Sequence, residues 1–209
     1  MKRILLGALG AVVLAAVSAM AAVSLGLIPF SADEPHSEAV RSLIVFARER
    51  SIAMAAVGVT IPDDLASPER IRRGAGNYEA MCAGCHLSPG AADTEIRKGL
   101  YPQPTNLSTK AEGQAVEAAD ARRFQIVKHG VKGSGMPAWS KGGMDDGAIW
   151  DLVAFVRVLP DTSPAGYRAL VEVSDGHSHA GMEGMGHEHG QHDHGAHPHA
   201  HAGHDHHGH

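Results

Sequence analysis

Cysteine and aromatic side chains are scarce in this chain, which has two cysteines and 4% aromatic residues in 209. Only two residues separate Cys82 from Cys85, and a bridge across so short a loop could not stabilise a fold, so a disulfide scaffold is excluded. A basic excess is also missing, because residues 62–173 carry thirteen Lys and Arg against fourteen Asp and Glu. Phosphates require a basic surface, so we expect no nucleic-acid partner.

The first 30 residues contain the longest apolar run of the chain. After Lys2 and Arg3, the 25 residues 4–28 carry no charge, and as a helix they would span about 37 Å, more than the hydrocarbon core of about 30 Å. Residues 1–30 are therefore either a transmembrane anchor or a secretory signal with a small-x-small cleavage site at Ala19–Ala21. The length of the run favours the anchor, and both interpretations export everything that follows.

Residues 31–61 are predicted to form a helix and a linker. The helix could be capped by Ser37 and should end near Gly58 and Pro62. Its apolar residues recur at helical spacing and are Val40, Leu43, Ile44 and Ala47. We expect this stripe to pack on the next domain. The alternative is an interfacial helix whose arginines lie near lipid headgroups, namely Arg41, Arg48 and Arg50.

Residues 62–173 are long enough for one domain, and their patterns are helical. Ser67 is a plausible N-cap for a first helix, with Pro68 at its first position. Gly74 lies mid-helix at a cost of about 1 kcal/mol, which suggests that another element crosses closely there. The apolar segment 145–160, which Pro160 terminates, is the candidate.

Between these two helices we predict a Gly/Pro-rich loop, residues 87–107, and a shorter helix over 115–128. No segment shows the alternation of a β-strand, so the fold class is all-α.

The segment C-A-G-C-H, residues 82–86, holds both cysteines and admits three interpretations. A redox dithiol of the thioredoxin kind needs a βαβ setting that these patterns lack. Structural zinc would need further ligands, and His86 is too close to Cys85 for an easy tetrahedral geometry, although the C-terminal histidines keep this interpretation open. C-x-x-C-H is the attachment signature of a c-type haem, in which Cys82 and Cys85 bond to the haem and His86 reaches the iron.

A haem iron would then take a sixth ligand or keep an open position. Met136 follows His86 by fifty residues, and nearby glycines allow the chain to loop over a flat group. A thioether favours ferrous iron and raises the reduction potential. His129 and Met144 are rival ligands, and Met136 could instead fill a gap in the core.

Residues 67–159 resemble a class I monohaem cytochrome c, because RGAGNYEAMCAGCH, GMPAW and IWDLVAFVRVL occur in the order of that family. The resemblance implies an all-α fold around one covalently attached haem, preceded by the apolar helix and followed by a disordered tail. It also implies a helix crossing in which Gly74 and Tyr78 meet Leu152 and Phe155. The proximal histidine of the family donates to a backbone carbonyl near a proline, for which the candidates are Pro89, Pro102 and Pro104.

Ligation by both His86 and Met136 would leave no position for a substrate. The resemblance therefore implies a one-electron carrier of a bacterial respiratory chain rather than an enzyme. It would lie on the periplasmic side of the inner membrane, or in the soluble periplasm after cleavage, and exchange electrons with a dehydrogenase, oxidase or reductase. The alternatives are a haem enzyme with an open sixth position and a periplasmic copper-handling protein with a redox haem.

Three lysines flank the Met136 loop and could form a basic rim that steers acidic partners, or could simply be solvated; they are Lys128, Lys132 and Lys141.

Residues 174–209 hold thirteen of the sixteen histidines and no Lys or Arg. With so few apolar residues the segment cannot fold alone, and we expect a disordered tail that binds Cu, Ni or Zn, with Met182 and Met185 as further copper ligands. A solubilising tail and an engineered tag are the alternatives. The candidate ligands are His187, His189, His192, His194, His197, His199, His201, His204, His206, His207 and His209.

Overall fold

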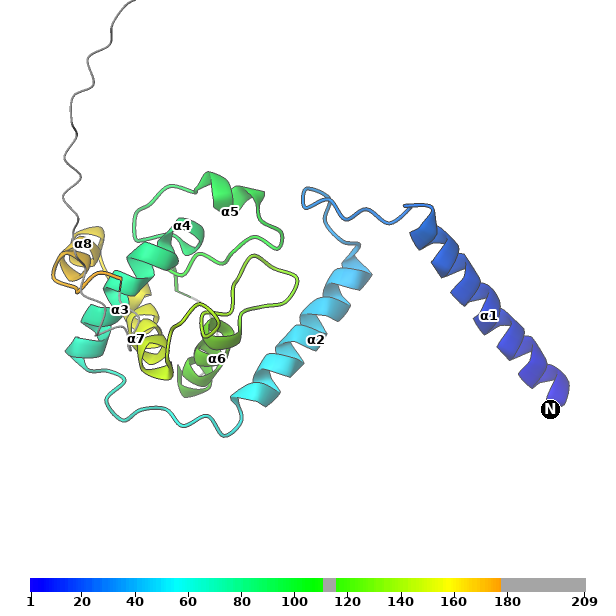
Figure 1. The fold of residues 1–209 in the computed structure, drawn as a ribbon, viewed down its shortest axis with the longest axis horizontal. Helices are drawn as coiled ribbons and strands as arrows, with labels where there is room; N and C mark the ends of the chain where they lie inside the picture. Colours follow the sequence, from blue (N-terminus) through cyan, green and yellow to red (C-terminus); the bar gives the residue numbers. More distant parts are fainter. Residues whose placement is uncertain (111–115, 178–209) are drawn as a thin grey trace, which may run out of the picture.

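The computed structural model describes residues 1–110 and 116–177, and in these ranges it contains helices and no strand (Figure 1). The all-α prediction is therefore confirmed for the described chain. The prediction of a disordered metal-binding tail falls mainly on residues 178–209, which lie outside it. In chain order the helices are α1 (Lys2–Ser24), α2 (Glu38–Ala56), α3 (Pro68–Met81), α4 (Ala83–His86), α5 (Glu95–Gly99), α6 (Val116–His129), α7 (Asp146–Val158), the 3₁₀ turn η1 (Leu159–Asp161) and α8 (Pro164–Glu172).

Helix α1 stands apart from the other helices and buries none of its residues (Figure 1). By length and composition it could cross a membrane, and a signal sequence would have the same features. The helix ends at Ser24, close to Gly26, whose φ of +67° lies in the left-handed region where glycine is favoured. The structure is therefore compatible with both an anchor and a signal.

Helices α3 and α7 form the centre of the domain and cross closely at Gly74. A Cβ atom at this position would lie 2.0 Å from the carbonyl oxygen of Asp151 in α7. The glycine is required for this approach, as the sequence predicts. One turn further along, the Tyr78 ring packs against Phe155 with a centroid distance of 5.4 Å, and both rings are fully buried.

Side-chain caps fix where these two helices begin. The Ser67 hydroxyl accepts a hydrogen bond from the Arg70 amide at 3.3 Å, and the Asp145 carboxylate accepts one from the Ala148 amide at 2.8 Å. Helix α7 ends at Val158, two residues before the predicted stop, and η1 carries the chain through Pro160.

Three short helices were not predicted, and α4 is the single turn formed by the C-x-x-C-H segment. Helix α5 lies inside the segment expected to be a loop, and α8 follows η1 and packs against α3. The Tyr167 ring of α8 is buried beside Tyr78 and Phe155, with centroid distances of 6.3 and 5.9 Å. Helix α8 therefore closes the aromatic part of the core.

Helix α2 packs on α6, but not through the predicted stripe. The half-buried side chains of α2 are Val45, Arg48, Glu49, Ile52, Ala53 and Ala56. Glu49 pairs with Arg122 of α6. The predicted stripe is exposed, and helical spacing alone had not shown which of two apolar faces meets the domain. In Figure 1, α2 and α8 lie on opposite sides of the α3–α7 pair.

Candidate haem site

The C-x-x-C-H segment forms a single turn directly after α3. Cys82 ends α3, and its carbonyl accepts hydrogen bonds from the amides of Cys85 at 3.0 Å and His86 at 2.8 Å. Leu87 leaves the turn with φ of +64°, and its carbonyl accepts a 2.6 Å hydrogen bond from the Tyr78 hydroxyl. The turn is therefore tied to the α3–α7 core on both sides.

Burial, together with the neighbouring Cys85, raises the pKa of the Cys82 thiol to about 12. A redox dithiol needs a thiol with a lowered pKa, whereas the pKa of Cys82 is raised, so the turn does not suit a redox dithiol. Within residues 1–110 and 116–177, no group of three or more His, Cys, Asp and Glu side chains is placed to hold a metal. A zinc site at the turn would need ligands from elsewhere.

The imidazole of His86 is oriented by a backbone carbonyl. Its Nδ1 lies 2.8 Å from the Thr105 oxygen, and because a carbonyl can only accept, Nδ1 carries the proton and Nε2 keeps a lone pair. Burial lowers the pKa of His86, so the ring is neutral at pH 7. Thr105 follows Pro104 directly, so the structure selects this proline among the three candidates.

Arg97 of α5 is a residue of this site that the sequence did not reveal. Its Nε donates to the Pro104 carbonyl at 2.9 Å, one residue before the carbonyl that orients His86. A 2.9 Å contact between Nη1 and the Asp93 carboxylate holds the guanidinium in place. Its charge also lowers the pKa of His86, a smaller effect than burial. No sequence pattern marks an arginine in this role.

Met136 lies in a loop held by its own backbone. The Met136 amide donates to the Ser134 hydroxyl at 3.1 Å, and its carbonyl accepts from the Val131 amide at 3.2 Å. Gly130 has φ of +66°, and a Cβ atom there would lie 2.7 Å from the Met136 carbonyl oxygen. The glycine thus allows the loop to turn back on itself, as the sequence predicts.

The burial of the rival ligands differs from that of Met136. Met144 is a core residue, 3% exposed and packed with the α7 side chains, and His129 is exposed at the end of α6. Met136 is half-buried. Met144 is therefore used in packing, as expected, whereas the His129 side chain is exposed to solvent.

The segment after Met136 contains a buried hydrogen-bond donor without a partner. The Nε1 of Trp139 is buried and has no hydrogen-bond partner in the described part of the chain, although a buried unpaired N–H is costly. The two thiols and the neutral imidazole on one turn are the residues that fit a haem c.

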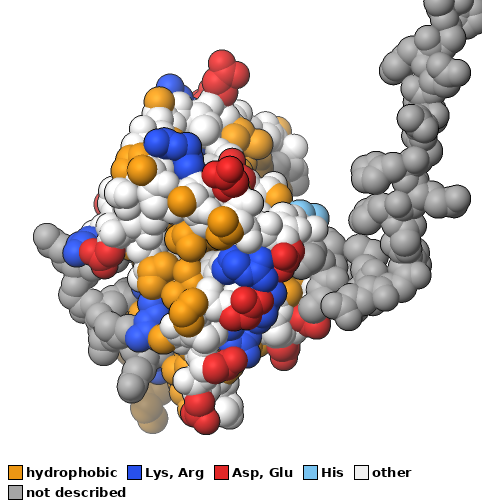
Figure 2. All heavy atoms as spheres, turned by 90° about the vertical axis from the view of Figure 1, so that its left-hand side faces the viewer, with side chains coloured by type: hydrophobic (Ala, Val, Ile, Leu, Met, Phe, Trp, Pro, Cys, Tyr) orange, Lys and Arg blue, Asp and Glu red, His pale blue; other side chains and the backbone are white. Residues whose placement is uncertain are grey.

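The predicted basic rim is weakened at Lys128, whose ammonium lies 2.6 Å from the Asp146 carboxylate. Lys132 and Lys141 are exposed. On the α8 side of the molecule, Figure 2 shows Lys and Arg side chains next to Asp and Glu side chains rather than a patch of one sign. Arg72, for example, contacts both Glu69 and Asp175 at 2.8 Å. This face offers no field of one sign to steer a partner.

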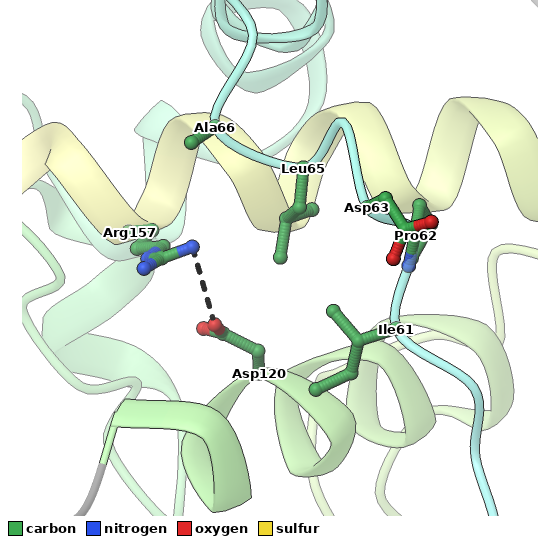
Figure 3. A pocket seen from close by; sticks show the side chains of 7 residues that line it. All are labelled: Ile61, Pro62, Asp63, Leu65, Ala66, Asp120 and Arg157. Atoms are coloured by element: carbon green, nitrogen blue, oxygen red, sulfur yellow. Dashed lines mark ion pairs between the residues drawn. The ribbon is translucent and has the colours of Figure 1, made fainter.

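A hollow between the linker, α6 and α7 lies apart from these residues (Figure 3). Its walls include Ile61 and Leu65, and its charged groups are Asp120 and Arg157, which face each other at 3.6 Å. Asp120 also pairs with Arg123 at 2.7 Å. Both charges are thus compensated within the protein, and none of the predicted site residues lines this hollow.

Residues 69–156 match the family described as cytochrome C oxidase, cbb3-type, subunit III. The chain therefore contains a cytochrome c domain, which implies haem c and supports haem-based electron transfer. The match encloses the C-x-x-C-H turn and the Met136 loop and leaves α1, α2 and α8 outside. Comparisons with curated proteins and with solved structures gave no match.

Proposed function

We propose that this protein is a one-electron carrier of a bacterial respiratory chain, with a haem attached covalently to Cys82 and Cys85. His86 and Met136 would be the axial iron ligands. The observation that carries the proposal is the orientation of His86 by Thr105, because it leaves a neutral Nε2 lone pair on the attachment turn. The matched cytochrome c domain supports the same function.

When bound, haem c would supply a reversible one-electron change at iron. Each proposed role belongs to a residue described above. The thiols fix the group covalently, Thr105 holds the His86 ring, and Arg97 holds the backbone beside Thr105. The soft Met136 thioether would favour the reduced state and occupy the position that a substrate would need. The residues thus suit an electron carrier better than an enzyme.

We further propose that the cytochrome domain occupies residues 62–173 on the periplasmic side of the inner membrane. Helix α1 would anchor it there, or would be removed as a signal, leaving the domain in the soluble periplasm. Its partners would be redox proteins, a dehydrogenase as donor and an oxidase or reductase as acceptor. The family match supports partners of this class without naming them.

Methionine ligation predicts a weak near-infrared band in the ferric protein, and Met136→Ala should abolish it. The expected cause is loss of the thioether ligand, since alanine has no donor atom. The measurement is the absorption spectrum of haem-loaded protein, wild type beside variant.

Met144→Leu is the matched control, because it removes a core methionine at nearly constant volume. It should keep the band. Persistence of the band in Met136→Ala would refute Met136 ligation, and a high-spin wild type would favour the enzyme with an open iron position.

We also propose that the histidine-rich segment binds Cu, Ni or Zn, on the basis of its thirteen histidines. Removal of residues 178–209 is expected to abolish high-affinity binding of Cu(II) while leaving the haem spectrum unchanged. Isothermal titration of both proteins at pH 7.5 and pH 5.5 is the test, and protonation of imidazoles near pH 6.5 should weaken binding at the lower pH. Equal binding by the truncated protein would exclude the tail as the metal site.

A further inference from the structure

Helix α2 has a second apolar face that the domain leaves uncovered. Its exposed side chains include Val40 (46%), Leu43 (67%), Ile44 (46%) and Met54 (61%). The opposite face carries Val45 and Ile52 and is covered by α6. A helix that is apolar on two sides needs a partner on each of them, because apolar side chains gain free energy on leaving water.

Arginines border this uncovered face. At about 100° per residue, the apolar side chains fill an arc of about 100° around the helix axis. Arg50 lies on one edge of the arc; Arg41, which pairs with Glu38, and half-buried Arg48, which pairs with Glu49, lie on the other. Apolar residues between basic edges are typical of a helix that lies in a membrane surface with its arginines reaching the headgroups.

The position of α2 along the chain indicates which partner covers it. Helix α1 ends at Ser24 and α2 begins at Glu38, so the 13 connecting residues span at most about 45 Å. The connection itself begins with exposed apolar residues, namely Leu25, Leu27, Ile28 and Phe30. A spanning α1 therefore keeps the face of α2 close to lipid at a high effective concentration.

We propose that α2 lies on the outer surface of the membrane, with the face formed by Val40, Leu43, Ile44 and Met54 inserted at the boundary of headgroups and acyl chains. Because α2 is packed on α6, and Glu49 is paired with Arg122, the cytochrome domain is then held in one orientation relative to the bilayer. The proposal rests on α1 as a retained membrane anchor, but it does not depend on how the haem iron is ligated.

The test uses the full-length haem-loaded protein in vesicles of phosphatidylcholine and phosphatidylglycerol. A cysteine is introduced by Leu43→Cys, and its rate of modification by a charged, membrane-impermeant maleimide is measured. Ala169→Cys, an exposed position on α8, is the matched control and corrects for inward-facing molecules. We expect Leu43→Cys to react at least about tenfold more slowly, as for a site in lipid more than nine-tenths of the time.

Equal rates at the two positions would overturn the proposal. Slow reaction that becomes fast when the protein is diluted into more lipid would also overturn it, because a second copy of the chain would then cover the face. Protection that is unchanged by dilution supports lipid contact. Leu43 is exposed, so its replacement should not disturb folding, and an unchanged haem spectrum verifies this.

Discussion

Gly74→Ala is expected to lower the free energy of unfolding by about 3 kcal/mol or more, near the upper limit for overpacking. The added Cβ would lie 2.0 Å from the Asp151 carbonyl oxygen and 2.8 Å from the Phe155 Cβ atom. These atoms cannot move away independently, because they belong to the backbone and the fixed part of a side chain in the most buried helix. The α3–α7 pair would have to separate.

Urea unfolding of the haem-loaded protein measures this effect. Gly99→Ala is the control, because this helical glycine at the end of α5 has no atom within 4 Å of an added Cβ. Its stability should stay close to the wild type. Equal stabilities of the two variants would show that the helices do not cross as closely as described.

Asp151→Ala is expected to cost about 3–5 kcal/mol, the range for removing one partner of a buried ion pair. The Asp151 carboxylate is 7% exposed and lies 2.8 Å from Arg70 and 2.6 Å from Arg73. Removing it leaves two guanidinium groups of α3 without this partner at the crossing. Each arginine keeps a second carboxylate, Arg70 with Asp64 at 2.9 Å and Arg73 with Glu69 at 3.1 Å, but both of these carboxylates are exposed and compensate less than buried Asp151.

Thermal unfolding followed by circular dichroism compares this variant with Asp175→Ala. Asp175 also pairs with an arginine of α3, Arg72, but it is exposed, and exposed ion pairs contribute little. We therefore expect a clear fall in melting temperature for Asp151→Ala and almost none for Asp175→Ala. Similar falls in melting temperature for the two variants would contradict the conclusion that the burial of Asp151 makes its ion pairs important for stability.

Local chemistry made the centre of the fold predictable. Ser67 begins α3 because its hydroxyl satisfies a free amide, and this depends on residues only three apart. Gly74 predicts a close crossing because a helix seldom contains glycine without a reason. The C-x-x-C-H segment needs no distant partner, since its groups belong to one turn.

Features that depend on distant contacts were less predictable. Helix α8 has the same Ser-Pro start as α3, at Ser163 and Pro164. It is short, however, and only the packing of Tyr167 beside Tyr78 in the folded domain shows that α8 belongs to the core. The choice of Thr105 as the partner of His86 depends on how the loop folds, which Arg97 helps to fix. The prediction of which face of α2 packs on the domain was wrong, because the helix has apolar residues on two faces.

The placement of α2 and α8 on opposite sides of the domain also decides how the protein can be handled. A reporter protein inserted directly after α8 would start on the side of the domain away from the apolar face of α2. A fusion at the N-terminus would instead precede Lys2 and extend helix α1, which by length and composition could cross a membrane. Reporters for imaging and crosslinking studies should therefore be attached next to α8.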